Sequence, residues 1–330
     1  DGTIMPGLID AHVHMGWGSA TAVDWISMTP QLSMARALRD MAQLRQQGYT
    51  AFRDLGSDVL LMRPAVAEGL LDVPRIFGAG RIISQIGGHG DVYQKLSLEA
   101  SQRAYSPAFI VNGVDEVRRA CRINARNGAD LIKIMTTGGV FSQGDKATPH
   151  SHFSQEEIRA AVEEAENMGS YVSTHAQATR GIKLALKNGV KCIEHGFYLD
   201  EECIELMVKN DCYLVPTLAI MHASKLYFQG KEGVLPYLKE KTEKSYEAHY
   251  RSLEMARKAT SPWVSAATFW ETLPSDARTA RPRWSWSGCV WRGIRPWRSS
   301  PWPPRSTHGC CRWRISWERW KPASWRMCCW

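Results

Sequence analysis

The 330-residue chain is 44% hydrophobic and 22% charged, and its formal net charge is +8. Pro262–Trp330 carries 11 Arg and one Lys against three acidic residues, a net charge of +9, so the first 261 residues sum to −1. No apolar run in this sequence is long enough to span a membrane.

Residues 1–261 alternate between strand-like and helix-like patterns. The expected strands, which are short apolar runs, are Leu8–His14, Thr50–Leu55, Arg75–Gly78, Leu131–Met135, Tyr171–His175, Cys192–His195 and Tyr213–Leu218. The expected helices, which have amphipathic spacing, are Leu32–Gln46, Val114–Asn127, Ser154–Met168, Gly181–Lys187, Asp200–Lys209 and Tyr237–Lys258. Ser154 and Glu157 have the spacing of a capping box at a helix start. Seven strands alternating with helices predict an α/β fold with a parallel sheet, and at this length a (β/α)8 TIM-like barrel.

A doubly wound open sheet is the alternative fold. Such a sheet usually has a Gly-rich phosphate loop directly after its first strand, and the residues after His14 do not form one. Gly87–Gly90 is glycine-rich, but no helix pattern follows it directly. We therefore expect the barrel.

Polar side chains occur at or near the carboxyl ends of several expected strands. His12 and His14 are separated by one residue, so their rings point to the same side of an extended strand. Lys133 lies in an otherwise apolar strand, where a buried charge is costly, and His175 and His195 each end a strand. In a barrel these ends converge on one face, so the five residues predict a metal site.

Each of these residues also has a simpler interpretation. A single His at a strand end is more often a satisfied structural residue, and Lys133 could pair with a core carboxylate. Five such accidents would have to fall on the same barrel face, which favours the metal site. The remaining histidines lack this placement, and we expect solvated or supporting roles for His150, His152, His222 and His249.

The chain resembles the amidohydrolase superfamily, in the branch of imidazolonepropionase-like proteins and metal-dependent Xaa-Pro dipeptidases (prolidases). Several ordered motifs carry the resemblance, namely Met5–His14, Tyr49–Gly56, Gly87–Asp91, Leu131–Gly139, Thr174–Ala176 and Glu194–Gly196. It implies a hydrolase of amide bonds, acting on dipeptides or N-acyl amino acids. A cyclic-amide hydrolase is the alternative within the same class.

The resemblance also implies the roles of individual residues. His12 and His14 would bind one of two divalent metal ions, and His175 and His195 would bind the other. Lys133 would be carboxylated and bridge both ions, which explains a lysine in an apolar strand. Zinc suits these nitrogen and oxygen ligands best. His89, Arg180 and Tyr198 would contact a small-molecule or dipeptide substrate.

The segment Pro262–Trp330 differs from the rest of the chain, since it holds 12 of the 14 Trp and 5 of the 9 Cys. A basic Trp-rich arm could bind nucleic acid or a membrane, but this one has no periodicity. A shifted reading frame joins the third base of each codon to the first two bases of the next codon. In that frame the codons of Trp263–Val264 must encode Gly and those of Trp320–Lys321 must encode Glu, and the shifted frame permits ordinary protein sequence. We expect a frame slip between about Ala259 and Pro262, and no fold beyond it.

The shifted frame also bears on catalysis. The family needs a general-base aspartate at the end of the eighth strand, and in the shifted frame its codon would straddle Ala267 and Thr268. The frame as translated has no aspartate there. We therefore expect an incomplete barrel, residues 1–261, that has lost roughly 10²-fold or more in activity.

The resemblance also implies properties of the whole protein. The family's small β-sandwich normally precedes Pro6–Asp10, so we expect an N-terminally truncated chain. We expect a cytoplasmic protein with neither a nucleic-acid nor a membrane partner, and we leave a homo-oligomer open. A noncatalytic product whose Arg/Trp-rich tail binds anionic partners is the alternative of a different class.

Overall fold

The structure is a computed structural model that describes residues 7–17, 28–94, 96–140, 142, 150–228 and 236–259. All of these belong to one compact unit. The tail Pro262–Trp330, which follows the expected frame slip and contains the position of the missing aspartate, lies outside the described residues. Residues 1–6, before which the family's β-sandwich is expected, also lie outside them.

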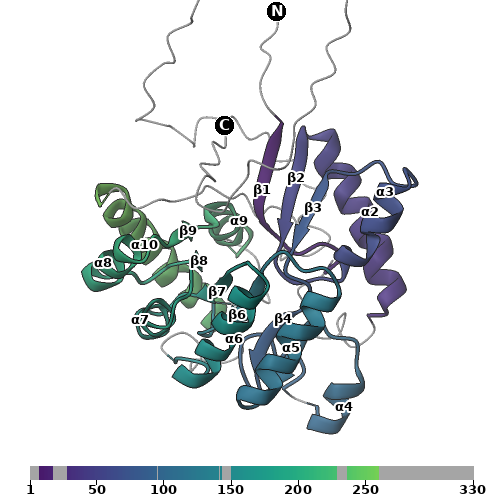
Figure 1. The fold of residues 1–330 in the computed structure, drawn as a ribbon. Helices are drawn as coiled ribbons and strands as arrows, with labels where there is room; N and C mark the ends of the chain where they lie inside the picture. The colour runs from purple at the N-terminus through teal and green to yellow at the C-terminus, as the bar shows by residue number, and fades with distance from the viewer. Residues whose placement is uncertain are drawn as a thin grey trace, which may run out of the picture. The chain divides into compact units, whose positions relative to one another are not determined.

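The strands form two parallel sheets (Figure 1). The first has the order β1 (Leu8–Val13), β2 (Tyr49–Asp54) and β3 (Arg75–Gly78). The second has the order β5 (Ala108–Val111), β4 (Ile82–Gln85), β6 (Ile132–Met135), β7 (Val172–Ala176), β8 (Cys192–His195) and β9 (Tyr213–Val215). Neighbouring strands run parallel in both sheets.

The two sheets are joined through one bent segment. β3 pairs with β2, and only three residues later β4 pairs with β6. The backbone N–H of Asp130, just before β6, also donates to the Gly78 carbonyl in β3 at 2.8 Å. β3 and β4 together are therefore one barrel strand, bent at Gly80, whose φ of 69° is favourable for glycine.

The resulting strand order confirms the predicted class of fold. From β1 to β9 the strands follow one another around the sheet in chain order, apart from β5, which adds to the free edge of β4. A doubly wound sheet would instead reverse its order at a switch point. Seven barrel strands are thus present in the described part of the chain.

The helices follow their strands and cover the outside of the sheet (Figure 1). Their bounds are α2 Pro30–Gln46, η1 Val59–Met62, α3 Arg63–Ala67, α4 Leu98–Arg103, α5 Val114–Arg126, α6 Gln155–Asn167, α7 Thr179–Lys187, α8 Glu201–Lys209, α9 Leu218–Phe228 and α10 Pro236–Lys258. The capping box at α6 is confirmed, since Ser154 and Glu157 each accept from the other's backbone N–H. No helix among the described residues is long and apolar enough to cross a bilayer.

Six elements were not predicted, namely β4, β5, η1, α3, α4 and α9, and one prediction was wrong. The strand expected over Tyr213–Leu218 ends at Val215, and Leu218 begins α9. Thr217 between them has a φ of 51°, a left-handed conformation that ends an extended strand.

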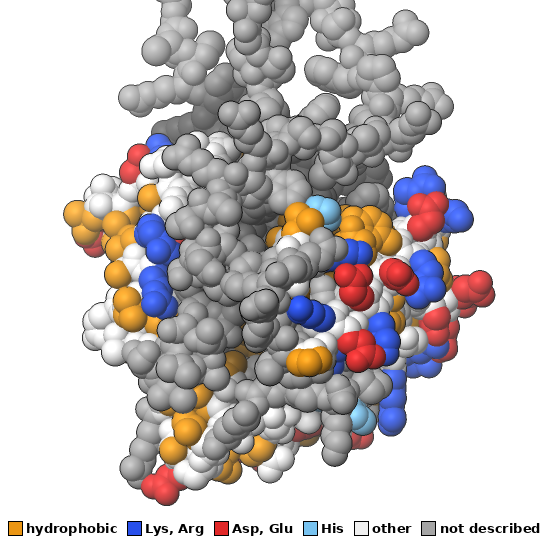
Figure 2. All heavy atoms as spheres, turned by 180° about the vertical axis from the view of Figure 1, so that it is seen from behind, with side chains coloured by type: hydrophobic (Ala, Val, Ile, Leu, Met, Phe, Trp, Pro, Cys, Tyr) orange, Lys and Arg blue, Asp and Glu red, His pale blue; other side chains and the backbone are white. Residues whose placement is uncertain are grey.

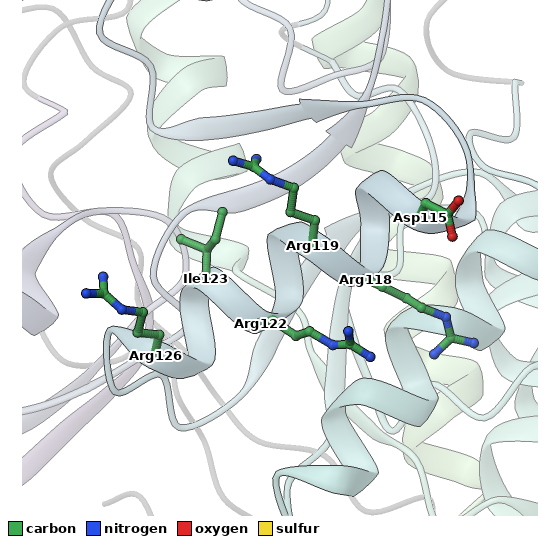
Figure 3. Close-up of a pocket in the computed structure, with 6 residues that line it drawn as sticks. All are labelled: Asp115, Arg118, Arg119, Arg122, Ile123 and Arg126. Carbon is green, nitrogen blue, oxygen red and sulfur yellow. The ribbon is translucent and has the colours of Figure 1, made fainter.

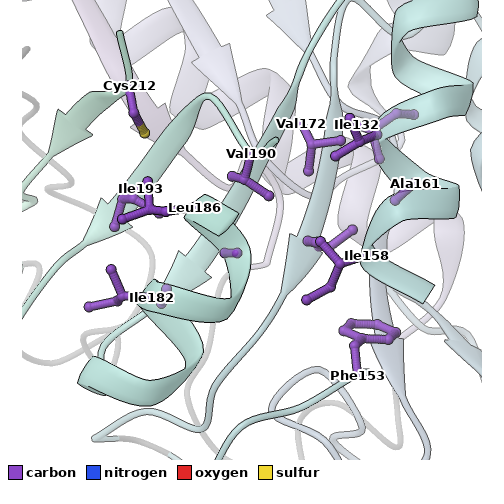
Figure 4. Packing of buried hydrophobic residues seen from close by; sticks show 14 of the residues in the cluster. Ile132, Phe153, Ile158, Ala161, Val172, Ile182, Leu186, Val190, Ile193 and Cys212 are labelled. Carbon is purple, nitrogen blue, oxygen red and sulfur yellow. The ribbon is translucent and has the colours of Figure 1, made fainter. Parts of the chain in front are cut away.

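The largest apolar core fills the space between the sheet and the helices that follow β4–β8 (Figure 4). Ile132 and Ile193 point outward from their strands and meet Ile158 of α6 and Ile182 of α7, and all four are buried. Full burial of such a side chain is worth about 1.5–3 kcal/mol. By strand alternation, Lys133 and Glu194 then face the inside of the barrel.

Candidate functional site

Five histidines meet inside the barrel, at or just after the carboxyl ends of the strands. Their ring centroids form a chain of contacts, with His12–His14 at 5.1 Å, His12–His195 at 4.9 Å, His195–His175 at 4.5 Å and His175–His89 at 4.1 Å. They come from β1, β7, β8 and the loop after β4. The structure therefore brings together residues that are up to 183 positions apart in the sequence, from His12 to His195.

Lys133 of β6 lies with this cluster. Its side chain is 1% exposed, and among the described residues its Nζ has no hydrogen-bond partner. Burial lowers its pKa to about 8, although the negative charge of Glu194 opposes the shift. The positive charge of Lys133 in turn lowers the pKa of His12, although burial is the largest cause of that shift. A buried amine without a hydrogen-bond partner raises the free energy of the folded state, so the surroundings of Lys133 Nζ favour binding of a ligand.

The direction of the His195 ring depends on an unusual backbone. Alternation along β8 would point this side chain outward with Ile193, toward the apolar core. The φ of His195 is instead 75°, in the left-handed region, and its ring packs against those of His12 and His175. Non-glycine residues in this region often mark functional sites.

Four of the five histidines have one ring nitrogen held by the protein, and at His89 Nδ1 lies 2.5 Å from Oγ of Ser142. Nδ1 of His12 lies 2.6 Å from Oε2 of Glu194, and Nδ1 of His195 lies 2.6 Å from Oγ1 of Thr217. Nε2 of His175 donates to the Gly138 carbonyl at 3.2 Å. The opposite nitrogen of each ring is left to bind another ligand.

The unpaired atoms of the cluster suit a metal site whose ligands include Lys133. Among His, Cys, Asp and Glu side chains alone, the described residues contain no group of three that could hold a metal ion. Lys133 lies outside that set of residue types, and two buried atoms of the cluster lack a partner, namely Lys133 Nζ and His14 Nδ1. A metal site with histidine nitrogens and a carboxylated lysine would satisfy atoms that the described protein leaves unpaired.

The three expected substrate contacts lie in different surroundings. His89 joins the cluster, since its ring stacks on that of His175, and a Cβ on Gly139 would come within 2.8 Å of it. Arg180 is exposed on α7, and the Tyr198 hydroxyl lies 3.1 Å from Ser245 of α10. No hydrogen bond or ring contact joins Arg180 or Tyr198 to the five histidines in the described structure.

Solvated or supporting roles were predicted for the remaining histidines. His152 and His249 are buried, which leaves the supporting role for both. The ring of His249 packs on that of Phe197 at 4.3 Å, and the Phe197 ring lies 5.9 Å from that of His195. His249 is therefore part of the support beneath the cluster.

A buried ionic network beneath the histidines was missed from the sequence. Glu194 is 0% exposed, and Oε1 accepts from Arg53 Nη2 at 2.5 Å and from Ser173 Oγ at 2.6 Å. Arg53 also donates to the Ala11 carbonyl at 2.7 Å. Burial alone would raise the pKa of Glu194, but the charges of Arg53 and Lys133 hold it well below its ordinary value. The sequence contained a signal for this network, because Arg53 and Glu194 are charged residues within expected apolar strands.

A groove of about 470 Å³ lies elsewhere, along α5 (Figure 3). It is lined by Asp115, Arg118, Arg119, Arg122, Ile123 and Arg126. None of the predicted site residues lines it. The guanidinium groups of Arg118 and Arg122 extend toward α6, where they pair with Glu163 and Glu164. This groove is thus part of a helix–helix surface and not of the histidine cluster.

Comparison with known proteins identifies the family of this chain. Residues 3–256 match the amidohydrolase family. Ochratoxinase from Aspergillus niger is 33% identical over 270 residues, which cover 78% of this chain and 56% of that protein. The chain therefore spans about half the length of this curated relative.

Solved structures show the same similarity. The crystal structure of A. niger ochratoxinase matches with a TM-score of 0.73 at 31% identity, covering 80% of this chain and 63% of that one. A prolidase complexed with N-methylphosphonate-L-proline matches with a TM-score of 0.73 at 34% identity, covering 83% and 67%. A Xaa-Pro dipeptidase with bound methionine matches with a TM-score of 0.70 at 29% identity, covering 81% and 67%. With its barrel order, its histidine cluster and a family match over residues 3–256, the chain belongs to the amidohydrolase family.

Proposed function

We propose that this protein is a metal-dependent hydrolase of amide bonds, with dipeptides or N-acyl amino acids as its substrates. The observation that carries the proposal is the unpartnered amine of Lys133 among histidines from three strand ends. The amidohydrolase family is generally metal-dependent. The similarity to ochratoxinase, a prolidase and a Xaa-Pro dipeptidase supports an amide bond as the target.

The proposed mechanism assigns each residue of the cluster one task. His12 and His14 would hold one metal ion, His175 and His195 a second, and carboxylated Lys133 would contribute oxygen ligands to both. Two zinc ions would supply an activated water and polarise the scissile carbonyl. His89 lies beside His175 and would orient the substrate, and Arg180 and Tyr198 would bind its more distant groups. The products would be an amine and a carboxylate.

The general base that the resemblance implies would lie within Pro262–Trp330, outside the described residues. We propose that the protein as translated binds metal but turns over slowly, because the aspartate that would take the proton from water occurs only in the shifted frame. Resequencing the codons for Thr260–Trp263 tests this directly. A single-base correction that restores Gly-Ser-Asp supports the hydrolase, whereas an unchanged sequence leaves the protein without its base.

Metal binding by the purified chain tests the site without relying on turnover. Wild-type protein should bind two zinc ions and incorporate isotopically labelled bicarbonate as a lysine carbamate visible by NMR. Lys133→Met should abolish the carbamate signal and reduce bound zinc. Lys183→Met is the matched control, because Lys183 pairs with Asp200 and Glu202 at the surface. Wild-type binding of zinc that is unaffected by Lys133→Met would contradict the assignment.

Substrate class requires a separate assay. Hydrolysis of Xaa-Pro dipeptides, of N-acyl amino acids and of a cyclic amide should be compared under zinc saturation. We expect slow turnover of one of the first two classes. Preference for the cyclic amide would favour the imidazolonepropionase-like alternative.

A further inference from the structure

The contact between His12 and Glu194 is the most enclosed polar contact in the histidine cluster. Nδ1 of His12 lies 2.6 Å from Oε2 of Glu194, and the two residues are 1% and 0% exposed. They are 182 positions apart in the chain, in β1 and β8. Both side chains are buried, so their protein partners decide which atom carries the proton.

Glu194 has no freedom to turn away from His12. Its second oxygen, Oε1, is used by Arg53, by the Ser173 hydroxyl and, at 3.3 Å, by the Cys192 thiol. Arg53 is itself anchored, since it also donates to the Ala11 carbonyl and, at 3.2 Å, to the Tyr171 hydroxyl. The carboxylate is therefore fixed on both sides, with a guanidinium to compensate its charge.

An ionised carboxylate can only accept hydrogen bonds. Nδ1 of His12 must therefore carry the hydrogen, which leaves the lone pair on Nε2. The contact at His195 is different, because the Thr217 hydroxyl can donate or accept and so suits either tautomer. Glu194 thus selects a tautomer at His12, whereas Thr217 restrains only the ring direction of His195.

We propose that Glu194, held by Arg53 and Ser173, is a positioning residue that fixes His12 as its Nδ1–H tautomer and directs Nε2 toward a metal ion. The ligand is a divalent cation, so this inference rests on the proposed function. It adds that β8 serves both metal positions, because Glu194 orients a ligand of one ion and the next residue, His195, is a ligand of the other. Histidine ligands generally need such a partner to hold ring orientation.

A purely structural role for Glu194 predicts different behaviour. If the carboxylate served only to pair with Arg53 in the core, its replacement would reduce folding stability and leave metal affinity of the folded protein unchanged. If it positions His12, replacement by the isosteric amide must weaken metal binding in protein that is still folded. Metal affinity separates the two roles.

The main experiment measures zinc affinity of the full chain by competition with a chelator, and the absorption spectrum of the cobalt-substituted protein. Glu194→Gln should weaken one of the two sites about 10- to 100-fold and alter the cobalt spectrum. Glu164→Gln, which changes another arginine-paired carboxylate on α6, should leave both unchanged. Wild-type affinity and spectrum in folded Glu194→Gln would overturn the proposal.

Two further measurements keep the inference testable if Glu194→Gln does not fold. Ser173→Ala removes one bond to the carboxylate and should cause a smaller loss of affinity at the same site. The tautomer of His12 can be read by NMR in metal-free wild-type protein, with His12→Gln to assign its signal. An Nδ1–H tautomer supports the proposal, and an Nε2–H tautomer overturns it. Absence of zinc binding by the wild type would refute the proposed function instead, without changing the tautomer result.

Discussion

Two carboxylates of this protein are held by arginine in very different places. Glu194 lies inside the barrel, where it is 0% exposed and Arg53 is 12% exposed. Glu164 lies on α6 with its side chain 7% exposed, and Arg122, which holds both of its oxygens, is 69% exposed. On the face shown in Figure 2, described acidic and basic side chains likewise lie beside one another at the surface. The same ion-pair chemistry thus occurs with a largely exposed arginine and with a largely buried one.

The difference shows how burial changes what an ion pair does. Hydrogen bonds from Arg122 are the largest cause that lowers the pKa of Glu164, and burial matters less. At Glu194 burial is the largest effect and would raise the pKa, so the charges of Arg53 and Lys133 are needed to keep the group ionised. Removing a partner at the surface admits water, whereas removing one inside the barrel strands a charge.

The largest expected effect comes from breaking the interior pair. Arg53→Met should lower the free energy of unfolding by about 3–5 kcal/mol, because it leaves Glu194 buried without its guanidinium. Urea denaturation at neutral pH measures the change. A loss below about 1 kcal/mol would show that Glu194 is compensated by other groups, and the comparison between the two regions would fail.

A second interior carboxyl should give the protein a characteristic pH dependence. Burial raises the pKa of Asp54 from 3.8 to about 6, although the backbone N–H groups of Met15 and Gly56 oppose the shift. The folded state therefore binds this proton more tightly than the unfolded state. The resulting stability is present below about pH 4 and is lost as the pH rises through about 6, a change of about 3 kcal/mol at most.

Asp54→Asn tests this contribution. The variant should lack that part of the pH dependence, so the difference in unfolding free energy between wild type and variant should change between pH 4 and pH 7. Urea midpoints at several pH values for both proteins give the result. Parallel curves would mean that Asp54 titrates alike in the folded and unfolded states.

The start of α6 provides an intermediate effect on the exterior. The Ser154 hydroxyl accepts from the Glu157 N–H at 3.2 Å, and Ser154→Ala should lower the free energy of unfolding by about 1 kcal/mol. Thermal or urea unfolding measures it, with Ser154→Asp, which can still accept that bond, as the control. A loss as large as that of Arg53→Met would remove the distinction between interior and exterior.

The smallest effect is expected at the Arg122–Glu164 ion pair, whose arginine is 69% exposed. Arg122→Met should cost less than about 1 kcal/mol, because the arginine is mostly solvated and Arg118 still pairs with Glu164. Added salt should reduce the difference from wild type, since it screens exposed charges. The same salt series should barely change the effect of Arg53→Met, which sharpens the comparison.

Much of the fold could be predicted because its signals are local. The helix predicted over Val114–Asn127 is observed as Val114–Arg126, and the capping residues of α6 mark its start. The strand over Cys192–His195 was predicted with its observed bounds. β4 and β5 were missed although β3 and β8 are equally short, because β4 continues β3 across the bend at Gly80 and β5 adds to the free edge of β4.

The candidate site was likewise predictable only where its signals are local in the sequence. The sequence by itself determined the alternation of strands and helices, and it indicated His12, His14, Lys133, His175 and His195, because polar groups at the ends of apolar strands stand out locally. Only the tertiary structure decided that the His195 ring turns inward, and that Glu194 meets His12 and Arg53 across the barrel. Both depend on barrel closure and strand register, because Glu194 meets its partners only when distant strands come together and bury it.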